Sequence, residues 1–143
     1  MSKPIRILVA DDNAPLRKVM KDVLTRAGYE VLLAEDGLDA FEKALAVRPD
    51  LVITDGLMPK LHGFLVCKML NQLEPPPKVI LLTAVYTKPE YESEVKQRYG
   101  ADELLIKPCR VADLLACIAN LLAGTAWQTE EASEEIKGRR QYE

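Results

Sequence analysis

The amino-acid sequence predicts an α/β fold, a doubly wound, open sheet of five parallel strands with five helices. Short runs rich in β-branched residues and leucine alternate with longer stretches whose apolar residues recur at helical spacing, and this pair occurs five times. Strict alternation of strand and helix is typical of a parallel sheet with helices on both faces. Five units are too few for an eight-stranded barrel, so we expect an open sheet with its ligand site beyond the carboxyl ends of the strands.

Length and composition are those of one globular domain. The chain has 143 residues, of which 48% are apolar and 29% charged, enough to bury a core and inconsistent with disorder over most of its length. The formal net charge is −3, so no overall field attracts nucleic acid or an anionic membrane. We therefore expect neither direct nucleic-acid binding nor membrane association.

The apolar runs and the cysteines indicate a cytoplasmic protein. No run reaches the length of a membrane span, and the apolar start is too short for a signal peptide because Asp11 and Asp12 end it. The three cysteines are odd in number and scattered, which argues against a disulfide framework. The single histidine, His62, argues against a zinc site built from cysteine and histidine.

The first strand and helix have the clearest pattern. An apolar run at Ile5–Ala10 predicts a buried strand. The helix after it begins near Pro15, which suits a first turn, and ends before Gly28, which suits a C-terminal cap. The apolar residues of this helix fall on one face, opposite the charged ones; they are Leu16, Val19, Met20, Val23, Leu24 and Ala27.

The other units repeat this pattern along the chain. Each has a short apolar run followed by a stretch of helical periodicity. In chain order, the expected elements are a strand at Glu30–Glu35, a helix at Leu38–Val47, a strand at Leu51–Asp55, a helix at Gly63–Leu73, a strand at Lys78–Thr83, a helix at Pro89–Tyr99, a strand at Glu103–Ile106 and a helix at Val111–Ala123.

The composition changes beyond Gly124. We assign residues 1–124 to the globular domain and residues 125–143 to a charged tail, which is a short helix or the start of a linker. The last expected helix is apolar on almost its whole circumference, with Asp113 and Asn120 as its polar residues. Two explanations remain open: a partner surface, such as a homodimer through this helix, or coverage by the tail with Trp127 as anchor.

Polar side chains gather where the expected strands end. Asp11 and Asp12 follow the first strand, Asp55 ends the third, Thr83 ends the fourth, and Lys107 follows the fifth. The carboxyl ends of parallel strands meet at one edge of a sheet, so we expect these side chains to converge. Three close carboxylates repel one another unless a cation lies among them, and oxygen ligands with room for water suit Mg²⁺.

Each of these residues alone has an ordinary explanation. Aspartates at strand ends or before helices commonly cap or form turns, Lys-Pro is a common surface dipeptide, and a lone threonine carries no information. All of them fall on one predicted edge of the sheet and none on the other. This coincidence favours a functional site.

Four motifs, in their order and spacing, resemble the receiver domain of two-component response regulators. They are Asp11-Asp12, Asp55-Gly-Leu-Met-Pro59, Thr83-Ala84 and Lys107-Pro108, and the resemblance covers about residues 4–123. It implies the flavodoxin-like strand order 2-1-3-4-5. It also implies signalling: a histidine kinase or histidine-phosphotransfer protein donates a phosphoryl group to an aspartate, and the changed conformation regulates an effector protein or domain.

By this resemblance, Asp55 is the phosphoryl acceptor and Mg²⁺ the cofactor. Asp12 would bind the ion directly and Asp11 largely through water, while Asp55 and the backbone carbonyl of Leu57 would complete the ligands. Lys107 would pair with the acceptor and then with a phosphoryl oxygen, and Thr83 would turn to hydrogen-bond the phosphoryl group. The protein would catalyse its own phosphoryl transfer and hydrolysis without being an enzyme for a separate substrate.

Two positions depart from the family pattern. Leu104, three residues before Lys107, stands where an aromatic residue is usual, which leaves open whether it replaces the aromatic ring that moves with the threonine. His62 stands where an acidic or amide residue often caps the third helix. We assign no chemistry to this histidine, because a lone loop histidine is usually a solvated side chain.

Three other functions fit parts of the pattern. A flavodoxin-type cofactor binder would share the fold, but Asp11 and Asp12 would repel a bare phosphate, and no glycine-rich nucleotide loop is present. A magnesium-dependent phosphatase would need a second acid close to Asp55, and Gly56-Leu57 offers none. A degenerate receiver that acts only by docking would not need the acceptor residues, which are intact.

Overall fold

The computed structural model describes residues 3–58, 60–84 and 89–126. They divide into two units, of which the first ends at Cys109 and the second begins at Arg110. The first unit holds the whole sheet and the first four helices, and the second holds the last helix.

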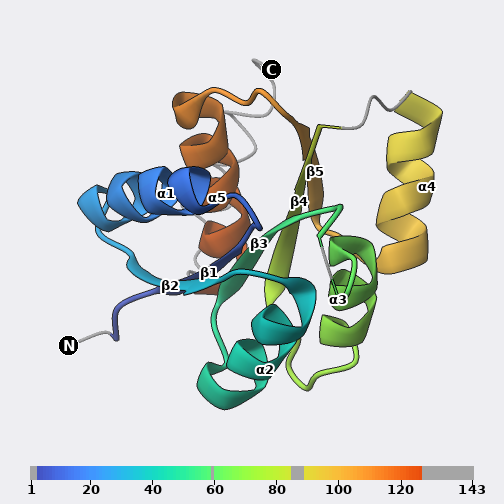
Figure 1. Cartoon of the computed structure of the whole chain (residues 1–143), viewed down its shortest axis with the longest axis horizontal. Coiled ribbons are helices and arrows are strands. Elements are labelled where there is room, and N and C mark those ends of the chain that lie inside the picture. The colour runs from blue at the N-terminus through green and yellow to red at the C-terminus, as the bar shows by residue number, and fades with distance from the viewer. Residues whose placement is uncertain (1–2, 59, 85–88, 127–143) are drawn as a thin grey trace. The chain divides into compact units, whose positions relative to one another are not determined.

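The sheet of the first unit has five parallel strands: β1 (Arg6–Ala10), β2 (Glu30–Ala34), β3 (Leu51–Asp55), β4 (Lys78–Thr83) and β5 (Glu103–Ile106). Their order is β2-β1-β3-β4-β5, which confirms the predicted class and strand order (Figure 1). The register places Ile7 of β1 beside Val31 of β2 and Leu51 of β3. The inner strands β1, β3 and β4 are almost entirely buried, as expected for apolar runs covered on both faces.

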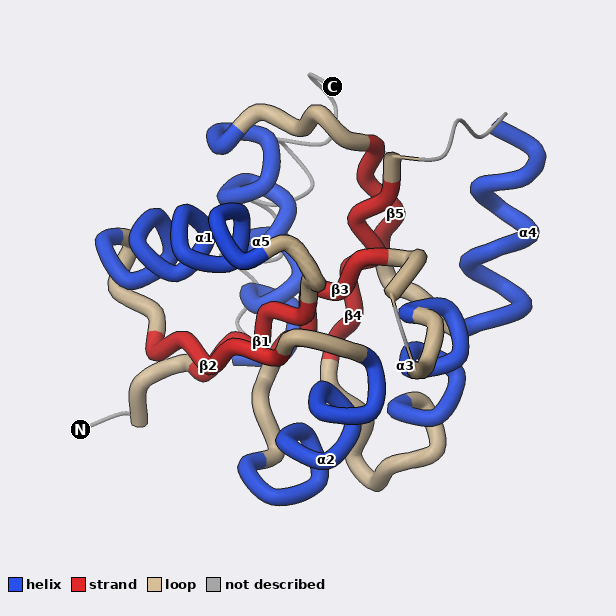
Figure 2. The backbone as a smooth tube through the Cα atoms, viewed as in Figure 1, coloured by secondary structure: helices blue, strands red, loops and turns tan. Residues whose placement is uncertain are grey.

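A helix follows each strand along the chain (Figure 2). The helices are α1 (Ala14–Arg26), α2 (Gly37–Val47), α3 (Gly63–Leu70), α4 (Pro89–Tyr99) and α5 (Val111–Ala126). Within the first unit, α2, α3 and α4 lie side by side on one face of the sheet, and α1 lies on the other face (Figure 1). In the part of the chain that the structure describes, no helix combines the length and the apolar character needed to cross a bilayer.

The second unit is α5. Its buried side chains Leu114, Ile118 and Leu122 recur every four residues and so lie on one face. Val111, at its first turn, is 49% exposed. The helix continues through Gly124 to Ala126, and Trp127 with the rest of the charged tail lies outside the described residues.

The ends of α1 follow from its sequence. Asn13 is the N-cap, and its Oδ1 accepts a hydrogen bond from the N–H of Leu16 at 3.0 Å. Pro15 occupies the first turn, where its missing N–H costs no helical hydrogen bond. Gly28 follows the C-cap with φ of 99°, a left-handed conformation that glycine adopts without steric cost.

Helix α3 ends at Leu70, earlier than the predicted Leu73. The side-chain amide of Asn71 donates to the carbonyl oxygens of Tyr99 and Gly100, at 3.0 and 2.9 Å, and so ties the chain to the turn between α4 and β5. Three prolines at 75–77 cannot donate helical hydrogen bonds and exclude a continuation. Helical periodicity alone cannot reveal the contact with a turn about 30 residues away in sequence.

Two aromatic rings join α3 to α4 beside the end of β3. The ring centroids of Phe64 and Tyr99 lie 5.3 Å apart. Phe64 also lies against Gly56, where an added Cβ atom would come within 2.7 Å of Phe64 Cε2. The glycine that follows Asp55 therefore makes room for this ring.

We predict that Gly56→Ala lowers the free energy of unfolding by about 1–3 kcal/mol, because the added methyl group overlaps the Phe64 ring. Shortening the ring in Gly56→Ala/Phe64→Leu should recover part of this loss, so the two substitutions should be non-additive. Urea unfolding of the wild type, both single variants and the double variant measures the coupling. Strictly additive losses would contradict the steric contact.

Candidate functional site

Asp11 and Asp12 follow β1 at the carboxyl edge of the sheet. Asp11 is buried and Asp12 is exposed. The backbone of Asp11 is fixed, because its carbonyl oxygen accepts from Arg17 Nη1 at 2.6 Å and its N–H donates to the carbonyl oxygen of Ala34 at 3.2 Å. Asp11 Oδ1 accepts from the N–H of Asn13 at 2.9 Å. These contacts orient the Asp11 carboxylate and leave that of Asp12 accessible to water.

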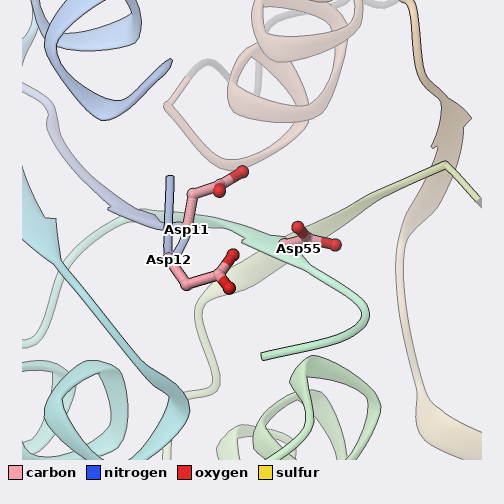
Figure 3. A group of neighbouring side chains, drawn as sticks. All are labelled: Asp11, Asp12 and Asp55. Carbon is pink, nitrogen blue, oxygen red and sulfur yellow. The ribbon is translucent and has the colours of Figure 1, made fainter. Parts of the chain in front are cut away.

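Asp55 lies at the end of β3 and is partly buried. Its Oδ1 accepts a hydrogen bond from the N–H of Leu57 at 3.2 Å. Asp11, Asp12 and Asp55 can each offer one oxygen such that all three oxygens lie within 4.8 Å of one another. Figure 3 shows the three side chains extending from the ends of β1 and β3 into a shared space. The three predicted carboxylates are therefore neighbours.

Lys107 connects two of these carboxylates. Its Nζ donates to Asp11 Oδ2 at 2.9 Å and to Asp55 Oδ2 at 3.2 Å. Burial alone would lower the pKa of Lys107, but hydrogen bonds and charge interactions with Asp11 and Asp55 outweigh it and raise that pKa above its ordinary value. The ammonium group is therefore firmly protonated at neutral pH.

Thr83 and Lys107 are joined through the backbone. The N–H of Lys107 donates to the carbonyl oxygen of Thr83 at 2.7 Å, which holds the segment after β5 against the end of β4. Thr83 is buried, and its Oγ1 lies 3.4 Å from the position that a Cβ atom on Gly56 would occupy. The threonine hydroxyl thus lies next to the residue that follows Asp55.

The charges of the site favour a divalent cation. With all three carboxylates ionised, the single ammonium of Lys107 leaves two negative charges without a partner in the cluster. The donors in this cluster are carboxylate oxygens. Leu57, whose carbonyl is the fourth predicted ligand, lies two residues after Asp55. Hard oxygen donors with one water-accessible side fit Mg²⁺ better than a thiophilic or imidazole-seeking metal.

Two residues near the site have a role that the sequence pattern does not indicate. Arg17 lies one turn into α1 and holds the Asp11 carbonyl oxygen, but its place in the pattern is that of an ordinary charged face. Phe64 lies against Gly56, but its apolar character predicts only a place in the core. Contacts of this kind depend on how separate elements approach one another, which residue spacing does not encode.

The two departures from the family pattern occupy ordinary structural positions. Leu104 is 5% exposed and belongs to the apolar core that also contains Leu81. His62 is the N-cap residue of α3, and its side chain makes no capping hydrogen bond. Neither residue adds a polar group to the acidic cluster.

Comparison with known sequences identifies the family. The chain matches the response regulator receiver domain family over residues 7–119. It is 35% identical to response regulator MprA of Mycobacterium ulcerans over 132 residues, which are 92% of this chain and 56% of MprA. It is 32% identical to the alkaline phosphatase synthesis transcriptional regulatory protein PhoP of Bacillus subtilis, over 94% of this chain and 56% of PhoP. The chain thus spans about half the length of these relatives.

Solved structures have the same architecture. The receiver domain of the Francisella response regulator 1452 superposes with a TM-score of 0.78 at 28% identity, covering 86% of this chain and 99% of that one. The chemotaxis protein CheY4 of Vibrio cholerae superposes with a TM-score of 0.72 at 33% identity, over 81% and 97% of the two chains. Family match, relatives and strand order agree: the chain belongs to the response regulator receiver domains of two-component systems.

Proposed function

We propose that Asp55 accepts a phosphoryl group while Mg²⁺ is held by Asp11, Asp12, Asp55 and the Leu57 carbonyl. The observation that carries this proposal is the position of Lys107, whose ammonium bonds both Asp11 and Asp55. The phosphoryl group that approaches the acceptor carboxylate is itself an anion. Fixed positive charge beside the carboxylate is needed because it offsets the repulsion between the two anions. Membership of the receiver family supports the same assignment.

In the proposed transfer, an Asp55 oxygen forms a bond to phosphorus as the P–N bond of a donor phosphohistidine breaks. The donor imidazole leaves with the electron pair of that bond. Bound Mg²⁺ would supply two positive charges for the phosphoryl oxygens. Lys107 keeps its contact with Asp11 and transfers its other hydrogen bond from Asp55 to a phosphoryl oxygen, while Thr83 turns its hydroxyl toward the new group.

We propose a histidine kinase or histidine-phosphotransfer protein as the donor. The phosphorylated state would be read by an effector protein or by an effector domain of a longer chain. MprA and PhoP each extend well beyond the part that matches this chain, by about the length of a further domain. Three further predictions stand beside this proposal. They are a domain that ends at Gly124, a homodimer through α5 and a cytoplasmic location.

An enzyme that hydrolyses a separate phosphate ester is the less favoured alternative. A phosphatase with an aspartate nucleophile needs a second acid nearby to protonate the leaving group. Two residues past Asp55 the chain carries Leu57, whose side chain is 52% exposed and cannot donate a proton. We therefore propose that Asp55 is dephosphorylated only by the domain's own slow hydrolysis or by a partner.

Incubation with acetyl phosphate tests the acceptor. Intact-mass measurement should show one added phosphoryl group in the wild type, only when Mg²⁺ is present. The group should be absent from Asp55→Ala and retained by Asp22→Ala, which alters an exposed aspartate of α1 that pairs with Arg26. A phosphoryl group that persists in Asp55→Ala would exclude Asp55 as the acceptor.

The lifetime of the phosphoryl group tests the role of the residue two positions past Asp55. Leu57 cannot orient a water molecule for attack, whereas the amide of Leu57→Asn can, so we expect this variant to lose its phosphoryl group several times faster than the wild type. Leu65→Asn, a similarly exposed leucine on α3, is the matched control and should not change the lifetime. A phosphoryl lifetime in Leu57→Asn equal to or longer than that of the wild type would show that the side chain at position 57 does not limit hydrolysis. By the family resemblance, the residue two positions past Thr83 also tunes hydrolysis; this residue, Val85, lies outside the described residues.

A further inference from the structure

The segment between β3 and α3 carries the Leu57 carbonyl, and its described residues, 56–58 and 60–62, are here called the acceptor loop. Its far end lies directly against the first residue of α2. A Cβ atom on Gly37 would overlap the carbonyl oxygen of Leu61 and would lie 2.6 Å from its carbonyl carbon and 2.7 Å from its Cβ. Gly37 has no positive φ, so glycine is required here for space and not for backbone conformation.

An ion pair fastens the same two segments. Asp36 is the N-cap of α2: its Oδ1 accepts from the N–H of Asp39 at 2.8 Å, while its Oδ2 lies 3.5 Å from Lys60 Nζ. The hydrogen bond from Asp39 and the charge of Lys60 lower the pKa of Asp36, so its carboxylate is charged at neutral pH. Lys60 has φ of 69°, a conformation that non-glycine residues adopt only where their surroundings hold it.

The two ends of the acceptor loop are held against each other beside the end of β3. A Cβ atom on Gly63 would overlap the carbonyl oxygen of Asp55, and the N–H of Gly63 donates to the carbonyl oxygen of Gly56 at 3.1 Å. The N–H of Leu57 donates to Asp55 Oδ1. The base of the loop is thus closed beside the end of β3, and its later residues Lys60 and Leu61 lie against α2, which is a separate element.

We infer that Gly37, assisted by the Asp36–Lys60 pair, is a positioning residue for Mg²⁺ binding. The inference rests on the proposed function, because it assigns to α2 the task of holding the loop that carries the Leu57 ligand. A Cβ atom at position 37 would meet the Leu61 carbonyl group and not the end of a flexible side chain, so either the loop or the start of α2 must shift. A shift of a few tenths of an ångström in the loop matters for an ion that demands near-ideal octahedral geometry. Neither Asp36 nor Gly37 belongs to the acidic cluster.

The test compares Gly37→Ala with Gly28→Ala. Both substitutions strain the chain, but Gly28 has open space around it and lies in the turn after α1. Two quantities are measured on each full-length variant at a temperature where it is folded: the Mg²⁺ dissociation constant by titration calorimetry, and hydrogen exchange of the acceptor-loop amides in EDTA.

We expect Gly37→Ala to weaken Mg²⁺ binding about tenfold or more and to speed exchange of the loop amides. Gly28→Ala should lower the melting temperature and leave both quantities unchanged. Unchanged loop exchange and Mg²⁺ affinity in Gly37→Ala would overturn the inference. A wild type that binds no Mg²⁺ would instead overturn the proposed function, while the exchange measurement would still test the contact.

A milder variant serves if Gly37→Ala does not fold. Lys60→Met removes the ammonium from a side chain that is 64% exposed and keeps the backbone conformation. It should speed exchange of the loop amides a few-fold in EDTA. Lys78→Met removes an ion pair with Asp102 at the start of β4, away from α2, so it is the control and should leave loop exchange unchanged. If the loop amides exchange at the same rate in Lys60→Met and in the wild type, the Asp36–Lys60 pair does not help to hold the loop.

Discussion

The hydrogen bonds from Lys107 to Asp11 and Asp55 connect the carboxyl ends of three strands through one ammonium group. The residues concerned are 96 and 52 positions apart in the sequence, so only the folded sheet brings them together. The ammonium partly offsets the repulsion among the carboxylates and draws the segment after β5 toward β1 and β3. Without such a cation, three close carboxylates would oppose the fold.

Lys107 offsets only part of the negative charge of the three carboxylates, and the proposed chemistry depends on the charge that remains. One ammonium cannot balance three carboxylates, and the exposed Asp12 leaves the cluster open to water on one side. A second cation is therefore favoured, and a divalent one matches the remaining charge. Under the proposed function, the site gives up stability for metal binding, as is common where a local structural rule is broken.

The fold class and the gathering of the site residues could be predicted from the sequence, because the strand and helix patterns are local and a parallel sheet brings the ends of its strands together. The strand order was implied by the resemblance of the four motifs. Strand-helix alternation predicts a parallel sheet, and a parallel sheet places Asp11, Asp55, Thr83 and Lys107 at one edge whatever the details of packing. Contacts between elements could not be predicted. Examples are the early end of α3 at Asn71 and the fit of Gly37 against Leu61, in which each partner looks unremarkable in its own segment.

Thermal unfolding of the wild type and Asp12→Asn, each in EDTA and in excess Mg²⁺, tests the central claim of a charge-strained metal site. In EDTA, Asp12→Asn should be more stable than the wild type by about 1–2 kcal/mol, because it removes a repulsive charge at little steric cost. Excess Mg²⁺ should raise the melting temperature of the wild type much more than that of the variant, since the ion binds only the folded state. Asp22→Asn, on the exposed surface of α1, should show neither effect. An Asp12→Asn variant that melts below the wild type in EDTA would contradict the account.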